Sequence, residues 1–306
     1  MIVRSRIAWV YLVCLVPAAA HAQLLAYDPF NQSNGTLNGT ASSGGGAVWP
    51  TNPQLWQAAY PPSNGGSVTA NSLTYGSLAT SGGKVAMPGF SGSNNGSYRA
   101  LGTDRGGGPA DLWISFLHAG DSPGGYVLQL ANGNNLVADF GSPGGPAYGM
   151  RLYNEATGAG TGTQTTVAAT PTITPSFATH FFAVHLQLGQ AGNTNTVTMY
   201  LDPDTGSLGT AAPAGGSVAV YSTALNFHFD GIALAALTPA SGPAYFDEIR
   251  IGTTWTAVTP VPEPVGLTAV AVGGVGFVRA GQRWRRRERQ RLASPTRRPD
   301  RRPSIP

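Results

Sequence analysis

The sequence has a single cysteine, few charged residues and no convincing amphipathic helix. Cys14, the only cysteine, lies among residues 1–22, so the rest of the chain can form neither a disulfide nor a thiolate metal site. Only 10% of the residues are charged, and residues 23–260 carry five basic and eleven acidic side chains, a net charge of −6. A basic surface of the kind that binds nucleic acid is therefore not expected in this part of the chain.

The N-terminal segment has the three parts of a secretory signal peptide. The first six residues include two arginines, and Ile7–Val16 follows as an apolar segment. Ala20 and Ala22 supply the small residues of a cleavage site, so signal peptidase is expected to leave a mature chain that starts at Gln23. The alternative, a first transmembrane helix, is disfavoured because the apolar segment is short. The body of the chain, residues 23–260, is thus expected to be exported through the inner membrane.

The C-terminal part combines three features in a fixed order. It begins with a Pro-Glu-Pro element formed by Val261, Pro262, Glu263 and Pro264. The next stretch, residues 265–278, is apolar and Gly-rich, and is expected to form a transmembrane helix that starts after the prolines. A basic cluster follows that includes Arg279, Arg283, Arg285, Arg286 and Arg287. Clustered arginine keeps its end of a membrane helix on the cytoplasmic side.

This order resembles the PEP-CTERM sorting signal of exosortase-processed bacterial surface proteins, with residues 261–291 as the signal. The resemblance implies that an exosortase acts at Pro262–Pro264, that the inner membrane holds the chain only transiently, and that the mature protein reaches the cell surface or an extracellular matrix. The alternative is a simple membrane anchor with a basic stop, which leaves the Pro-Glu-Pro element unexplained. Residues 292–306 are rich in Pro and Arg and are expected to be disordered.

The short apolar span favours a transient membrane intermediate. Its 14 residues would extend only about 21 Å as a helix, against a hydrocarbon core of about 30 Å. Its four glycines also weaken the helix by about 1 kcal/mol each relative to alanine.

Residues 23–260 are long enough for one β-sandwich domain with a core. Short apolar or alternating segments, separated by Gly, Asn and Pro turns, predict about twelve antiparallel strands and no helix. The clearest segments are Asp111–Leu117, Tyr126–Leu130, Leu136–Phe140, His180–Leu188 and Thr196–Asp202. Shorter segments are Leu24–Phe30, Leu73–Tyr75 paired with Lys84–Met87, Tyr98–Leu101, Tyr148–Tyr153, Val218–Tyr221, Phe227–Leu237 and Tyr245–Ile251. Gly158–Pro175 is expected to be a loop. The fold class is therefore all-β, an antiparallel sandwich.

Four segments extend this prediction to a family. These segments occur in the order found in concanavalin A-like, laminin-G-like jelly rolls, and they are DLWISFL, FFAVHLQL, TVTMYLDP and FDEIRIGTTW. The resemblance covers residues 111–255 and implies a lectin-like jelly roll over residues 23–260.

Carboxylate spacing does not indicate a glycosidase. Retaining sandwich glucanases need two carboxylates about 5–5.5 Å apart on one face. Asp202-Pro203-Asp204 has the composition of a turn, with a calcium-binding loop as the minor alternative. Asp247 and Glu248 are adjacent, so they are expected on opposite faces of a strand, with one of them paired to Arg250 or lining a sheet surface.

The remaining motifs do not indicate an enzyme either. His180 and His185 are five residues apart, which places them on opposite faces of a strand and argues against a shared metal. No serine lies in a Gly-x-Ser-x-Gly elbow, and no Gly-rich segment joins a strand to a helix as a phosphate site requires. We therefore expect no catalytic residue, no metal and no cofactor.

Aromatic residues in polar surroundings supply the alternative function. Five rings lie among Asn, Ser and Gly residues, as in many sugar-binding sites: Trp49, Trp56, Tyr60, Tyr75 and Tyr98. The competing interpretation is that they fill the core. The first hypothesis is a non-enzymatic exported surface or matrix protein associated with exopolysaccharide. A carbohydrate-binding lectin-like module is the alternative, and a glycoside hydrolase is the least favoured.

Overall fold

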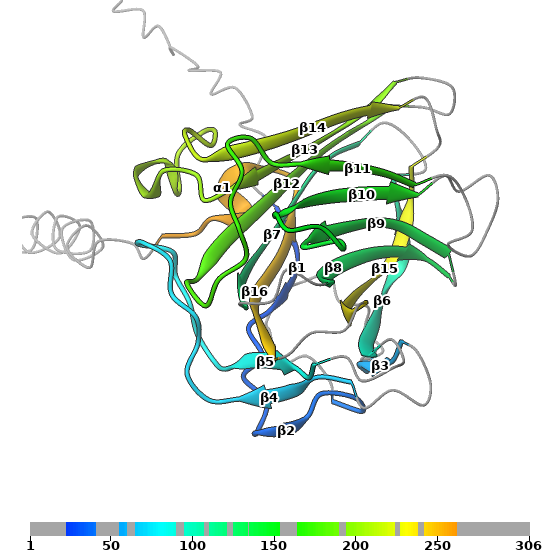
Figure 1. Cartoon of the computed structure of the whole chain (residues 1–306), viewed down its shortest axis with the longest axis vertical. Coiled ribbons are helices and arrows are strands. Elements are labelled where there is room, and N and C mark those ends of the chain that lie inside the picture. The colour runs from blue at the N-terminus through cyan, green and yellow to red at the C-terminus, as the bar shows by residue number, and fades with distance from the viewer. Residues whose placement is uncertain are drawn as a thin grey trace, which may run out of the picture. The chain divides into compact units, whose positions relative to one another are not determined.

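The computed structural model contains two antiparallel sheets packed face to face (Figure 1). It describes residues 23–40, 55–59, 65–89, 95–106, 110–120, 125–133, 135–153, 164–189, 194–223, 227–237 and 242–261. The predicted all-β sandwich is confirmed. The expected signal peptide, the 265–278 helix, the arginine cluster and the tail lie outside the described residues. Within the described residues, no helix is both long and apolar enough to cross a membrane.

Nine strands form the first sheet and seven form the second. The nine-stranded sheet has the order β14 (Ser217–Thr223), β13 (Asn195–Leu201), β12 (His180–Leu188), β7 (Ala110–Ala119), β16 (Ala244–Gly252), β5 (Lys84–Met87), β4 (Ser67–Thr69) and β2 (Gly35–Thr36), with β1 (Leu24–Asp28) paired to β16. The seven-stranded sheet has the order β11 (Gln164–Ala168), β10 (Gly149–Tyr153), β9 (Asn135–Gly141), β8 (Tyr126–Asn132), β15 (Phe229–Ala236), β6 (Asn95–Arg105) and β3 (Gln57–Ala58).

The strands follow the sequence pattern most closely where polar and apolar residues alternate. In β13, Val197, Met199 and Leu201 are buried, whereas the residues between them are only partly buried. This is the period of two that a half-buried strand requires. The predicted hairpins β12–β13 and β8–β9 are both present.

Three local predictions are wrong. Leu73–Tyr75 is not a strand, because the Leu73 amide donates to Asp247 instead of to a neighbouring strand; the partner of β5 is β4. The expected loop Gly158–Pro175 contains β11, an edge strand with little apolar burial. The expected absence of helix is also corrected, because Trp255–Val258 forms the short helix α1.

The main core lies between the two sheets and combines aliphatic side chains with several aromatic rings. Phe116 stacks on Phe182 with a centroid distance of 4.8 Å, and Phe246 packs beside Phe116. This core also contains an ion pair. Arg99 and Asp28 are almost completely buried, and their Nη1 and Oδ2 atoms are 2.7 Å apart.

A second apolar cluster covers the outer face of the nine-stranded sheet. Trp113 and Phe181 project from β7 and β12 and pack against Trp255 of α1. The Trp255 indole donates from Nε1 to the backbone oxygen of Ser207, at 2.9 Å. The Ala79 amide donates to the backbone oxygen of Pro260, also at 2.9 Å. The end of the described chain is thus fixed to the body through several contacts.

A β-bulge in β16 corrects the expectation for Asp247 and Glu248. Glu248 has a φ of 53°, and the pairing with β7 shifts between Asp247 and Arg250. The extra residue breaks the alternation of faces, so both carboxylates contact the segment over residues 72–81: Asp247 accepts from Ser72 and Leu73, and Glu248 from the Ser81 amide. The predicted pairing with Arg250 is confirmed for Glu248.

Candidate functional site

The outer face of the seven-stranded sheet carries a row of mostly polar side chains. Residues that are directly paired across a sheet lie on the same face. One such row crosses all seven strands and consists of Gln57, Tyr98, Ala233, Gln129, Asp139, Arg151 and Thr166. The row therefore links segments that are more than 100 residues apart in the sequence.

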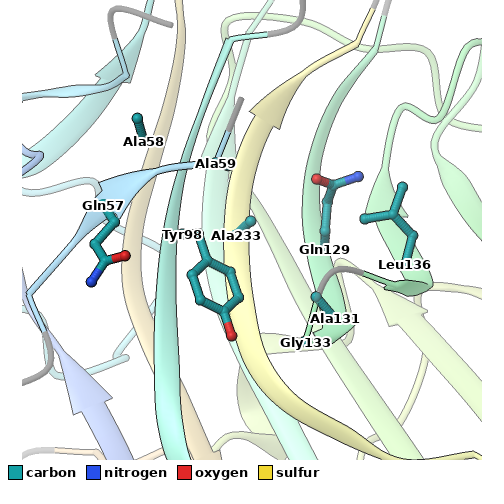
Figure 2. A pocket seen from close by; sticks show the side chains of 9 residues that line it. All are labelled: Gln57, Ala58, Ala59, Tyr98, Gln129, Ala131, Gly133, Leu136 and Ala233. Atoms are coloured by element: carbon teal, nitrogen blue, oxygen red, sulfur yellow. The ribbon is translucent and has the colours of Figure 1, made fainter. Parts of the chain in front are cut away.

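A cavity of about 390 Å³ opens over one end of this row (Figure 2). The residues that line it are Gln57, Ala58, Ala59, Tyr98, Gln129, Ala131, Gly133, Leu136 and Ala233. It combines one aromatic ring, two side-chain amides and several small apolar residues. A cavity of this size and composition is suited to a small polar ligand with an apolar face.

Gly231 determines how the Tyr98 ring lies. A Cβ atom at Gly231 would be only 2.3 Å from the Tyr98 ring atoms, so any larger residue would displace the ring. The Tyr98 ring therefore lies flat against the β15 backbone at Gly231. The same contact has a structural role, because a ring that covers a strand glycine protects its backbone.

The Tyr98 hydroxyl is held by Asp230, whose Oδ1 atom is 3.4 Å away and also accepts the Gly133 amide at 2.9 Å. Burial raises the pKa of Tyr98 to about 12, and the nearby Asp230 carboxylate adds to the rise. The phenol is therefore protonated at neutral pH and can act as a donor.

Asp139 organises the middle of the row. Its carboxylate accepts hydrogen bonds from Gln129 Nε2 at 2.8 Å, Tyr153 Oη at 2.6 Å and Arg151 Nε at 3.0 Å. Asp139 and Gln129 are both fully buried. Both carboxylate oxygens are engaged, so Asp139 positions Gln129 and Arg151 and is poorly placed to transfer a proton to a substrate.

Of the three predicted sugar-stacking rings among the described residues, Trp56, Tyr75 and Tyr98, only Tyr98 lines this cavity. Trp56 is completely buried, with its Nε1 atom donating to Asp28, so its ring is inaccessible. Tyr75 stacks on Phe181 on the other sheet and donates to the Pro203 carbonyl. Trp49 and Tyr60 lie outside the described residues. The lining amides were missed because only the strand register brings them beside Tyr98.

The other predicted sites fall mostly outside the described part of the chain. Ala20 and Ala22 precede it, and Pro262–Pro264 and the arginine cluster follow it. The two boundary residues are described: the Gln23 amide donates to the Thr253 hydroxyl at 3.2 Å, and Val261 is 37% exposed. Among the described residues, no cluster of three or more His, Cys, Asp or Glu side chains is arranged to hold a metal ion.

Comparisons with known proteins reach the fold and no further. No family model matches the sequence, and no curated protein matches it. Solved structures that resemble it include the botulinum neurotoxin serotype D binding domain, with 8% identity, a TM-score of 0.41, and coverage of 76% of this chain and 49% of that one. The chain thus spans about half the length of the neurotoxin binding domains.

Two further solved structures have the same kind of fold. Peanut lectin has 11% identity, a TM-score of 0.32, and coverage of 62% of this chain and 90% of that one. A β-1,3-glucanase from Mycobacterium marinum has 12% identity, a TM-score of 0.37, and coverage of 74% of this chain and 98% of that one.

Proposed function

We propose that this chain is an exported surface or matrix protein whose C-terminal segment is a sorting signal processed by an exosortase. The observation that carries the proposal is the order of the Pro-Glu-Pro element, the apolar span and the arginine cluster. An all-β body with low charge agrees with an extracellular location. This function needs no catalytic residue in the body, which would be the cargo.

Replacing Pro262, Glu263 and Pro264 by alanine tests the sorting proposal. The triple variant is expected to keep its C-terminal arginines and to accumulate in the inner membrane, because the processing enzyme no longer recognises the segment. Cell fractionation and intact mass measurement give the readout. Pro299→Ala, in the tail, is the matched control and should be processed normally. A triple variant that is cut to the same C-terminus as the wild-type chain would contradict processing at this element.

The cavity on the seven-stranded sheet supports a second proposal, carbohydrate binding by the body. The Tyr98 ring offers a flat apolar surface, and Gln57 offers an amide donor and acceptor beside it, while Gln129 lines the cavity as a buried amide bonded to Asp139. This combination suits the apolar face and hydroxyl groups of a hexose. The nine lining residues include no carboxylate, which disfavours hydrolysis of the bound sugar by a retaining carboxylate pair.

The second proposal predicts the effect of changing Tyr98. Tyr98→Ala is expected to weaken binding to hexose oligosaccharides about tenfold or more, because stacking contributes about 1 kcal/mol beyond area burial. Tyr98→Phe should stay within about threefold, since only the long bond to Asp230 is lost. A glycan array followed by calorimetry gives the measurement. Tyr75→Ala, whose ring packs against the nine-stranded sheet, is the control, and equal losses in both alanine variants would rule out a specific site.

A further inference from the structure

Ser176, His180 and Asp202 form a continuous hydrogen-bonded chain at the end of β12, away from the candidate carbohydrate site. Ser176 Oγ lies 3.0 Å from His180 Nε2, and His180 Nδ1 lies 2.7 Å from Asp202 Oδ2. His180 is 7% exposed, whereas Ser176 is only partly buried. The arrangement therefore connects a partly exposed carboxylate, through a buried imidazole, to a hydroxyl that solvent can reach.

The carboxylate at one end of the chain sets the direction in which its hydrogen bonds run. An ionised carboxylate can only accept hydrogen bonds, so His180 must carry its proton on Nδ1 when it donates to Asp202. The Nε2 atom of the neutral ring is then an acceptor, and the Ser176 hydroxyl is the donor that faces it. This is the relation of nucleophile, general base and orienting carboxylate that activates serine in acyl transfer.

Asp202 is held in place by the backbone around it. Its Oδ1 atom accepts the Phe181 amide at 2.9 Å, and its own amide donates to the Phe181 carbonyl at 2.9 Å. Its φ of 51° is unusual for a residue other than glycine. The strained backbone aims the carboxylate at His180, which goes beyond the turn role that the sequence suggested.

Ser176 is also fixed on its own side. Its carbonyl accepts the Gly120 amide at 2.9 Å, and its Oγ atom accepts the Ala178 amide at 3.3 Å. A serine hydroxyl has one donor and two acceptor sites, so one lone pair is still available for attack. The side chain of the next residue, Phe177, is 56% exposed and supplies an apolar surface beside the hydroxyl.

We propose that Ser176, His180 and Asp202 hydrolyse short-chain carboxylic esters presented at this surface. Ser176 Oγ bonds to the ester carbonyl carbon while its proton passes to His180 Nε2. The bond from that carbon to the alcohol oxygen breaks, and the leaving alcohol takes the proton from His180. Water then attacks the acyl-Ser176 ester with His180 as the base, which releases the acid and restores the Ser176 hydroxyl. The activity is independent of the sorting function.

The direct test is covalent labelling of the full chain in detergent with a fluorophosphonate, together with hydrolysis of p-nitrophenyl acetate. Mass spectrometry is expected to find one label per chain, on the peptide that contains Ser176. Ser176→Ala should abolish both the label and the Ser176-dependent hydrolysis. Ser222→Ala is the matched control, because Ser222 is bonded to Thr196 and not to a histidine, and it should leave both signals unchanged.

Asp202→Asn separates a reactive site from a structural contact. Asparagine tolerates positive φ at least as well as aspartate, so the fold should be kept. Its amide NH₂ would donate to His180 Nδ1 and force the proton to Nε2, where the ring can no longer accept from Ser176. Labelling should then slow by about 100-fold or more. The absence of a label on the wild-type Ser176, or equal labelling rates in folded Asp202→Asn, would overturn the proposal.

Discussion

Asp28→Ala is expected to lower the free energy of unfolding by about 3–5 kcal/mol, because it leaves a buried cation without its counter-charge. Asp28 accepts hydrogen bonds from Arg99 Nη1 at 2.7 Å, Trp56 Nε1 at 2.9 Å and the Phe30 amide at 3.1 Å. Burial lowers the pKa of Arg99 to about 10, so the guanidinium is still charged at pH 7. Urea unfolding followed by tryptophan fluorescence measures the loss.

A double variant distinguishes the charge from the packing. Asp28→Leu combined with Arg99→Met replaces both ions by apolar groups, and such replacements are often neutral or stabilising. We expect the double variant to be clearly more stable than Asp28→Ala, although the Trp56 indole still loses its acceptor. If the double variant were the less stable of the two, the uncompensated charge would not be the cause of the loss.

Stability is expected to fall as the pH rises from about 4 to about 8, with Asp247 as a main contributor. Burial raises the pKa of Asp247 from 3.8 to about 8, and the neighbouring Glu248 carboxylate adds to the rise. Over this range the folded chain holds a proton that the unfolded chain has released, so a higher pH favours unfolding. The slope from this one group is at most about 1.4 kcal/mol per pH unit.

Asp247→Asn provides the comparison for this pH dependence. Asparagine cannot ionise, so the variant should show a shallower decline in unfolding free energy between pH 5 and pH 8. The substitution also lowers the free energy of unfolding by an amount that does not depend on pH, because the new NH₂ group faces hydrogen-bond donors such as the Leu73 amide. The readout is therefore the difference in slope and not the absolute stability. Glu248 is present in both proteins and interacts with Asp247, so the difference in slope includes the coupling between the two carboxylates. Parallel curves would refute the role of Asp247.

The sequence predicted the sandwich because its best strands have an unambiguous pattern. The alternation in β13 and the apolar segments of β7 and β12 need no tertiary information. The wrong strand predictions occur where a tertiary contact determines the backbone conformation. β11 is half exposed at a sheet edge, so it lacks an apolar signature, and the Leu73 amide pairs with Asp247, a residue 174 positions away.

The candidate sites were much harder to predict than the strands. Tyr98 was singled out from its polar surroundings, but Gln129 and Gly231 join it only through the register of β6, β15 and β8. Ser176 and His180 are four residues apart, yet their partner Asp202 had a sufficient explanation as part of a turn. A strand pattern fixes which face a side chain takes and does not fix which residue lies opposite.

The contacts that fix Trp255 and Pro260 to the body end directly before the Pro-Glu-Pro element. Val261 alone separates Pro260 from Pro262, so under the proposed sorting function an exosortase would have to act within about 10 Å of chain from the last anchored atom. Such an enzyme would need a shallow, open cleft to clear the bulk of the cargo. An enzyme with a deep cleft could reach this element only after α1 had detached from the nine-stranded sheet. The rate at which the body is released would then depend on how readily that helix detaches.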